Sequence, residues 1–163
     1  MKKSIIIFAA ALLSVATFAQ PRAIGGRAGV NDEVSYQHSI GENFVELDLG
    51  FQLGLGSKGL GGVGIGTSAV YDFSIATPNW TPKGTWEFYA GPGIAFGTHF
   101  NNIPFYFGIC GQIGLSYTFW FPLQLSVDLK PVFGFQTGPN SGFYLPGMFG
   151  FVPTAGVRYC FGR

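Results

Sequence analysis

Large apolar side chains alternate one for one with small or polar residues over most of this 163-residue chain. The longest example spans residues 105 to 119, where only Gly111 interrupts the apolar side of the pattern. Successive side chains of a β-strand point to opposite faces, so this segment is predicted to be a strand with one apolar face and one small, mostly polar face. The 26 glycines add to the case for strands, because glycine is unfavourable in helix interiors.

The alternation recurs in five further segments and, more weakly, in two short ones near the N-terminus. The short segments, Ala23–Val30 and Val34–His38, could also form one strand with a bulge at Asn31–Asp32. Counted separately, they bring the total to eight, an even number as in single-chain bacterial barrels. The predicted fold is all-β, an eight-stranded antiparallel up-and-down transmembrane β-barrel. The five further segments are 45–54, 62–73, 86–94, 123–130 and 149–161.

Two kinds of barrel fit this pattern, and composition decides between them. A soluble barrel of the lipocalin type turns its apolar face inward around a ligand, whereas a membrane barrel turns it outward to lipid. Charged residues make up only 10% of the chain, so the small, Gly-rich face carries too little charge to solvate a soluble surface. We therefore expect the apolar face to meet lipid and the small face to line the lumen.

The predicted lumen face carries several acids and bases. Side chains can fill the interior of an eight-stranded barrel, and a charge buried there without a partner would be costly. A polar network is therefore expected, and its predicted members are Arg27, Glu46, Asp48, Asp72, Glu87, Asp128, Lys130 and Arg158. Cys110 and Cys160 share this face. We expect two separate space-filling thiols, because one strand and a difference in height separate them beyond the reach of a disulfide.

The first residues have the features of a secretory signal peptide. Met1–Lys2–Lys3 is positively charged, an apolar run follows, and small residues precede a predicted cleavage site between Ala19 and Gln20. The predicted organisation is a signal peptide over residues 1–19 and one barrel domain over residues 20–163. The residue directly after the cleavage site is Gln20 rather than cysteine, so a lipid anchor is not expected. The predicted location is the bacterial outer membrane.

The links between the segments indicate an orientation. If the last strand runs down to a periplasmic C-terminus, the short links 39–42 and 120–122 are periplasmic. The longer segments 97–103 and 137–147 are then external, and this asymmetry is typical of membrane barrels. The link 76–84 fits less well, because it is long for a periplasmic turn.

Aromatic and proline positions refine this prediction. Aromatic residues gather toward both ends of the segments, as interfacial girdles do. Pro92, Pro131 and Pro153 predict bulges or strand ends, because proline cannot donate a ladder hydrogen bond. The aromatic residues at the two ends are Trp80, Phe119, Trp120, Tyr159 and Phe161 on the periplasmic side, and Phe96, Phe133, Phe135, Phe143 and Tyr144 on the external side.

The segment Thr154–Phe161 resembles the assembly signal of bacterial outer-membrane barrels, in which a glycine and aromatic residues hold set positions on the last strand. The matching positions are Gly156, Tyr159 and Phe161. The match departs in that two residues follow Phe161, where many members end. From Ala23 onward the chain is similar to small outer-membrane barrel proteins of the OmpX and OmpW kind, including uncharacterised members. The resemblance implies recognition by the barrel-assembly machinery and implies no catalytic residues.

No motif in the chain carries catalytic chemistry. His38 and His99 are the only histidines, so a metal site or a Ser–His pair has little support. The glycines between Gly59 and Gly64 lack the strand–helix context of a dinucleotide site. We expect a non-enzymatic barrel without cofactor or metal, which acts in membrane structure, surface interaction or the passage of small solutes.

Two other functions stay open at this point. One is an OmpW-like binder or channel for small hydrophobic ligands, and the other is a lipid-modifying enzyme at the outer rim near His99. The expected partners are outer-membrane lipid and, during biogenesis, the barrel-assembly machinery, with the chain itself a monomer. Without the two lysines of the signal peptide, seven bases face eight acids, so no basic patch favours nucleic acid.

Overall fold

The computed structural model describes residues 21–29, 31–53, 63–100, 103–138, 141–144 and 151–161, and the predicted signal peptide lies outside these ranges. The described part of the chain is all-β and contains no helix. Its strands are β1 (Pro21–Ala28), β2 (Asn31–Ile40), β3 (Asn43–Leu53), β4 (Val63–Ala76), β5 (Thr85–His99), β6 (Ile103–Thr118), β7 (Leu123–Leu129), β8 (Val132–Gln136), β9 (Gly142–Tyr144) and β10 (Thr154–Cys160).

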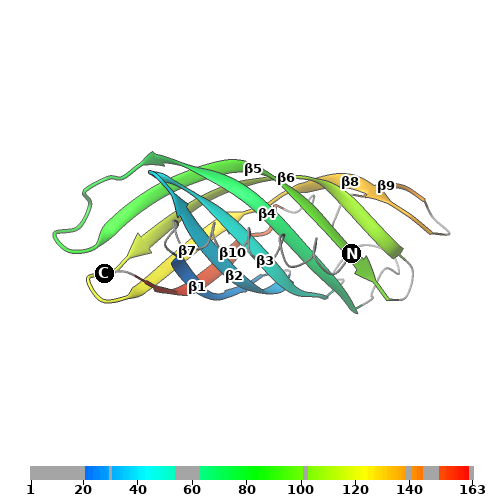
Figure 1. Cartoon of the computed structure of the whole chain (residues 1–163), viewed down its shortest axis with the longest axis horizontal. Helices are drawn as coiled ribbons and strands as arrows, with labels where there is room; N and C mark the ends of the chain where they lie inside the picture. The colour runs from blue at the N-terminus through cyan, green and yellow to red at the C-terminus, as the bar shows by residue number, and fades with distance from the viewer. Residues whose placement is uncertain are drawn as a thin grey trace, which may run out of the picture.

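These strands close into a barrel (Figure 1). From β5 the order runs through β4, β3, β2, β1, β10 and β7 to β6, and β6 pairs with β5 to complete the circle. Neighbouring strands are antiparallel. β7 and β8 both pair with β6, one after the other, and so occupy one position in the wall. β10 and β9 share the next position in the same way, because β10 pairs with β7 and β9 pairs with β8. The wall therefore has eight positions, which confirms the predicted eight-stranded antiparallel up-and-down barrel.

β1 and β2 are two separate strands. They pair with each other along their length, from Ala23 opposite Gln37 to Arg27 opposite Glu33. Because the chain reverses between them, the alternative of one long strand bulged at Asn31–Asp32 is wrong.

Two of the three predicted proline positions are strand ends. Pro131 separates β7 from β8, although both strands keep one register against β6, and Gly111 N–H donates to the Pro131 carbonyl at 3.1 Å. Pro153 directly precedes β10. Pro92 instead lies within β5, opposite Gly111. The pairs on both sides of Pro92 stay aligned with β6, so the 15-residue strand tolerates one missing donor.

The apolar face of the strands is on the outside of the barrel. Ile109 and Leu49 are 68% and 58% exposed, whereas Glu46 and Asp72 are fully buried. The predicted sidedness is therefore confirmed: large apolar side chains cover the outer wall, and most acids and bases of the described strands face the lumen.

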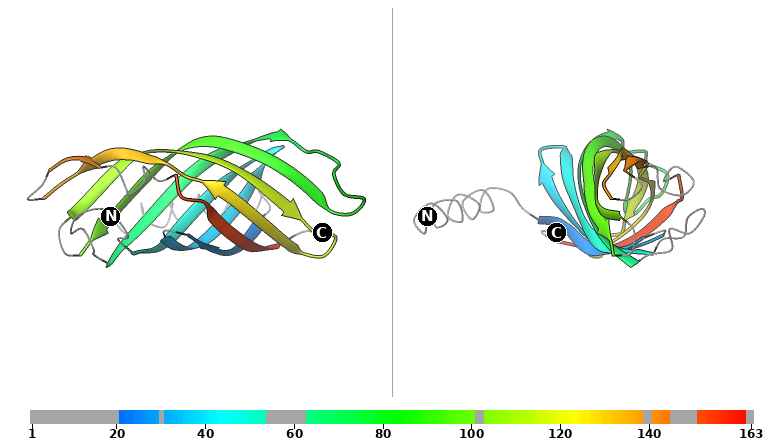
Figure 2. Two further views of the ribbon diagram at one scale, coloured as in Figure 1. Left: turned by 180° about the vertical axis from the view of Figure 1, so that it is seen from behind. Right: turned by 90° about the vertical axis from the view of Figure 1, so that its right-hand side faces the viewer.

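The two ends of the barrel differ (Figure 2). The end that carries the β2–β3 and β6–β7 turns is called the turn end, and the opposite end is called the loop end. The strands are long at β4, β5 and β6, with 14, 15 and 16 residues, and short at β1 and β10, with 8 and 7.

Three expected boundaries at the loop end are wrong. The segment 97–103 is not all loop, because β5 continues to His99 and β6 begins at Ile103. Within the expected loop 137–147, residues Gly142–Tyr144 pair with β8 as strand β9. The last strand begins at Thr154 rather than at 149, because Pro153 cannot donate to the ladder.

Inside the barrel, glycines leave room for tyrosine side chains of the adjacent, paired strand. Tyr89 of β5 faces Gly114 of β6, and Tyr106 of β6 faces Gly97 of β5. A Cβ at Gly114 would overlap the Tyr89 ring, and one at Gly97 would lie 2.6 Å from the Tyr106 hydroxyl. The glycine-rich face is therefore closely packed at these two levels.

Candidate functional site

The lumen contains a cluster of buried ion pairs centred on Arg27 of β1. Its guanidinium lies 2.6 Å from an Asp48 oxygen and 3.0 Å from a Glu46 oxygen, both on β3. On the other side it pairs with Asp128 of β7, and Glu33 of β2 lies 3.3 Å away. A single arginine thus links four strands across the interior.

Lys130 adds a second cationic centre toward the loop end of the cluster. Its ammonium donates to Asp48 at 2.8 Å, to Glu33 at 3.0 Å and to the Ser68 hydroxyl at 2.9 Å. Lys130 follows the last residue of β7, whereas Ser68 lies on β4 and Asp48 on β3. These contacts therefore span the lumen from one wall to the other.

Arg158 of β10 is the third cationic centre. It pairs with Glu46 at 3.0 Å and donates to the hydroxyls of Ser35 and Ser126 at 3.0 and 2.7 Å. Gly156 leaves room for it, because a Cβ there would lie 2.9 Å from an Arg158 nitrogen.

Neutral side chains complete the coordination of the acids. Gln37 and Gln112 donate to Glu46 at 2.6 and 3.2 Å, and the Tyr89 hydroxyl donates to Asp128 at 3.3 Å. Glu46 therefore accepts from three strands besides β1 and is the anionic centre of the cluster. We call the set Arg27, Glu33, Glu46, Asp48, Asp128, Lys130 and Arg158 the lumen cluster.

Six of the eight predicted network residues lie in the lumen cluster, and two do not join it by ion pairs. Asp72 is fully buried beside the cluster, but neither carboxylate oxygen has a hydrogen-bond partner among the described residues. Glu87 lies toward the turn end and pairs with Arg22 instead. The six members are Arg27, Glu46, Asp48, Asp128, Lys130 and Arg158.

Sequence reasoning missed Arg22 and Glu33. Strict alternation sends Arg22 outward, because Ala23 beside it faces the lumen. A register shift between Pro21 and Ala23, opposite His38 and Gln37, redirects the strand and lets Arg22 reach Glu87 on the far wall. Its guanidinium also lies 4.2 Å above the Phe44 ring. Glu33 was detectable, because extending the alternation of the second segment by one residue places it on the lumen face.

The lumen cluster can fasten the barrel together but offers little chemistry. Removing one partner of a buried pair leaves an uncompensated charge and commonly costs about 3–5 kcal/mol, whereas the intact pair adds little net stability. β1 to β7 and β10 each contribute a charged or hydrogen-bonded side chain to it or, in the case of Lys130, the residue that directly follows the strand. It therefore links the walls of the barrel to one another across the lumen.

Among the remaining candidates, those that the structure describes are not grouped into a catalytic or metal-ligating arrangement. Cys110 and Cys160 are both free and buried, and Cys110 packs with Val70 and Ala95. His38 Nδ1 lies 2.9 Å from the Tyr36 hydroxyl, on the outer wall. The side chain of His99 and the glycines at 59–62 lie outside the described residues. Within the described ranges, no group of three or more His, Cys, Asp or Glu is placed to hold a metal ion.

The residues of the resembled assembly signal lie on β10 and just after it. Gly156 faces the lumen beside Ser126, so a side chain there would collide with the Ser126 hydroxyl. Tyr159 and Phe161 face outward and are 54% and 40% exposed, with ring centroids 5.3 Å apart at 79°. They form one exposed aromatic pair near the C-terminus.

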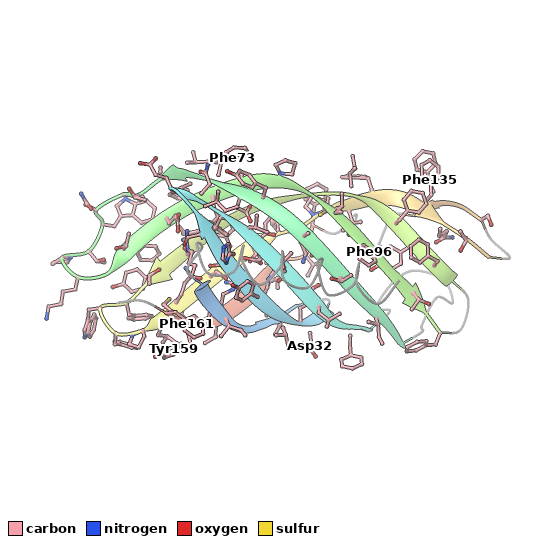
Figure 3. The ribbon with its side chains drawn as sticks, viewed as in Figure 1. Asp32, Phe73, Phe96, Phe135, Tyr159 and Phe161 are labelled. Atoms are coloured by element: carbon pink, nitrogen blue, oxygen red, sulfur yellow. The ribbon has the colours of Figure 1, made fainter. Side chains whose placement is uncertain are left out.

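Aromatic side chains gather on the outer wall at both ends of the barrel (Figure 3). Phe73, Tyr159 and Phe161 lie toward the turn end, whereas Phe96 and Phe135 lie toward the loop end. Ring pairs two residues apart recur on every second strand around the turn end, on or just after β2, β4, β6 and β10: Tyr36 with His38, Tyr71 with Phe73, Tyr117 with Phe119, and Tyr159 with Phe161.

Comparison of the chain with known protein families, curated proteins and solved structures found no match. Among the described residues, no helix is long and apolar enough to cross a membrane. The fold and the lumen cluster therefore carry the functional argument alone.

Proposed function

We propose that this protein is a non-enzymatic integral barrel of the bacterial outer membrane, which anchors its loop end at the cell surface. The observation that carries the proposal is the inverted distribution of side chains. Apolar residues such as Ile109 and Leu49 cover the outer wall, while Glu46, Asp128 and Arg158 are buried inside. Water would not solvate such a wall, whereas acyl chains would.

The height of the apolar outer wall is consistent with a position in a lipid bilayer. On β6, Phe107 and Tyr117 mark the aromatic levels of the two ends and are about ten residues apart. At a rise of about 3.3 Å per residue and a tilt of about 40–45°, they are separated along the barrel axis by about 25 Å. The apolar band of outer-membrane barrels has about this height.

The lumen cluster favours an anchoring role over passage of solutes. Ion pairs from Arg27 reach both β3 and β7, and Lys130 bridges β7 and β3, so no wide aqueous route passes this level. An eight-stranded barrel also has little interior space beyond its own side chains. Of the three roles that the sequence suggested, membrane structure and surface interaction through the loop end remain.

A second candidate is the binding of small hydrophobic ligands near the loop end. It is favoured by the apolar lining of the lumen beyond the cluster, where Val70, Ala95 and Cys110 pack together with Val132 against them. Saturable binding of an apolar fluorophore to the refolded barrel, lost on filling this level by Ala95→Phe, would support it.

The main proposal is tested by placing arginine on the outer wall at two depths. Ile113 of β6 is 56% exposed and lies near the middle of the span between Phe107 and Tyr117. Arginine at mid-bilayer costs about 2–4 kcal/mol, and near an interface about 0–1. Ile113→Arg should therefore block the folded, heat-modifiable form on gels of samples reconstituted in lipid.

The matched control is Ile40→Arg. Ile40 is 46% exposed but ends β2 at the turn end, so the variant should fold and migrate like the wild type. Equal folding of the two variants in bilayers would contradict the proposed lipid-facing wall, as would a wild type that runs at one position whether boiled or not.

A further inference from the structure

The link between β4 and β5, residues 77–84, folds against the outside of the barrel at the turn end. Trp80 of this link packs on Trp86 and Phe88 of β5, with ring centroids 5.4 and 5.5 Å apart. The series of ring contacts continues from Trp86 to Tyr117 at 4.6 Å, and on through Phe119 to Trp120 in the β6–β7 turn. The length that made this link unusual for a turn is thus used to form an aromatic surface.

All three tryptophans of the chain lie on this surface. Trp80 and Trp120 are 59% and 64% exposed. We call Trp80, Trp86 and Trp120, together with Lys83, the tryptophan corner. Indole rings favour the level of lipid headgroups, where an apolar body and a polar N–H are both accommodated.

The backbone of Lys83 is held in place by hydrogen bonds to its carbonyl oxygen. The hydroxyls of Thr81 and Tyr117 both donate to the Lys83 carbonyl at 2.8 Å, and Trp86 Nε1 donates to the Thr81 hydroxyl at 3.2 Å. Gly84 then turns the chain with a φ of 78°, and a Cβ there would lie 2.5 Å from the Tyr117 hydroxyl. The lysine position is therefore preorganised rather than carried on a free loop.

Lys83 differs from every other base of the described residues. Arg22, Arg27, Lys130 and Arg158 each form ion pairs within the barrel. Lys83 is exposed, has no ion pair among the described residues, and its ammonium lies 5.6 Å from the centroid of the Trp120 ring. It is thus an exposed positive charge on a held backbone, with no anionic partner among the described residues, near an indole ring at the edge of the apolar wall.

We infer that the tryptophan corner binds the headgroup of an anionic phospholipid in the leaflet at the turn end. This inference rests on the proposed function, because it requires the apolar wall to lie in a bilayer. The headgroup phosphate accepts from the Lys83 ammonium, and the glycerol region lies against the exposed indoles. An anionic glycerol headgroup is favoured over a zwitterionic choline headgroup, because the choline cation competes with Lys83 for the same phosphate.

The position of the tryptophans makes the test selective. Since the chain has no other tryptophan, intrinsic indole fluorescence reports on this corner alone. The refolded protein is placed in phosphatidylcholine bilayers that contain a small fraction of either brominated phosphatidylglycerol or brominated phosphatidylcholine. One basic side chain at an anionic surface predicts roughly two- to fivefold enrichment, so the wild type should be quenched more by the brominated glycerol lipid.

Three variants identify the cause. Lys83→Gln should keep the quenching but lose the preference, while Lys83→Arg should retain it. Glu42→Gln changes one charge in the β2–β3 turn at the same end and should leave the preference unchanged. Equal quenching of the wild type by both lipids, or an undiminished preference in Lys83→Gln, would overturn the lipid site alone. Absence of quenching by both lipids would overturn the membrane proposal together with the site.

Discussion

At the scale of single residues, the contrast between Arg27 and Asp72 shows how pairing determines the effect of a buried charge. Both lie on the lumen face and both are almost fully buried. Arg27 contacts four carboxylates, whereas the carboxylate of Asp72 has no hydrogen-bond partner among the described residues. Substituting the two should therefore change stability in opposite directions.

Arg27→Leu should lower the free energy of unfolding by about 3–5 kcal/mol, because Glu46, Asp48 and Asp128 lose their common cation. Asp72→Asn should raise it by about 1 kcal/mol or more, because the neutral amide removes the cost of desolvating or protonating a buried carboxyl that has no hydrogen-bond partner among the described residues. Urea unfolding of both variants in phospholipid bilayers measures the difference. A stability loss in Asp72→Asn equal to that in Arg27→Leu would show that Asp72 is part of the network.

At the scale of strands, alternation predicts faces well and pairing partners poorly. A period of two assigns each side chain to the lumen or to the outer wall, and Glu46, Asp48 and Arg158 are on the lumen face as expected. The register between strands depends on turns and bulges, which the alternation does not contain. Alternation alone therefore groups Glu87 with the other lumen charges, whereas the register shift between Pro21 and Ala23 lets Arg22 pair with it.

Short strands near prolines were the other part that sequence reasoning could not find. β8 is only 5 residues long after Pro131, and β9 is only 3. Neither strand is long enough to show a clear alternation. β8 is stabilised by pairing with β6, and β9 is stabilised by pairing with β8. The tryptophan corner was missed for a related reason, because its rings come from a link, a strand and a turn that meet only in the folded barrel.

The pairing of tyrosine with glycine across β5 and β6 gives a prediction at the same scale. Gly114→Ala should lower the free energy of unfolding by about 1–3 kcal/mol, because the new methyl group overlaps the Tyr89 ring. Gly26→Ala on the outer face of β1 is the control. The nearest atom to a Cβ there is the Glu33 carbonyl oxygen at 3.9 Å, so its effect should stay within about 0.5 kcal/mol. Equal unfolding midpoints for the two variants would contradict a closely packed lumen.

At the scale of the whole molecule, two separate layers of ion pairs cross the lumen of the barrel at different heights. Near the turn end, Arg22 and Glu87 join β1 to β5 across the lumen, with Phe44 beneath the guanidinium. Farther in, the lumen cluster braces the walls from β1 to β3 and β7. The two layers are separate sets of contacts, so each can be opened without removing the other.

This arrangement predicts how ion conductance responds to paired substitutions, which avoid leaving a lone buried charge. The wild type should show no measurable ion conductance in planar bilayers. Arg22→Ser with Glu87→Ser opens only the turn end and should stay silent, because the lumen cluster still blocks the passage. Arg27→Ser with Asp128→Ser removes the contact between β1 and β7 and should give a small conductance.

Heat-modifiable migration of each variant ensures that only folded barrels are compared. If the Arg27 and Asp128 double variant folds and stays silent, the barrier to ions lies elsewhere in the lumen. If the wild type already conducts, ions can pass the lumen cluster. Passage of small solutes would then be favoured over anchoring as the function of the barrel. The sign of the outcome therefore decides between the two roles, because the same buried ion pairs cannot both bridge the lumen and leave it open.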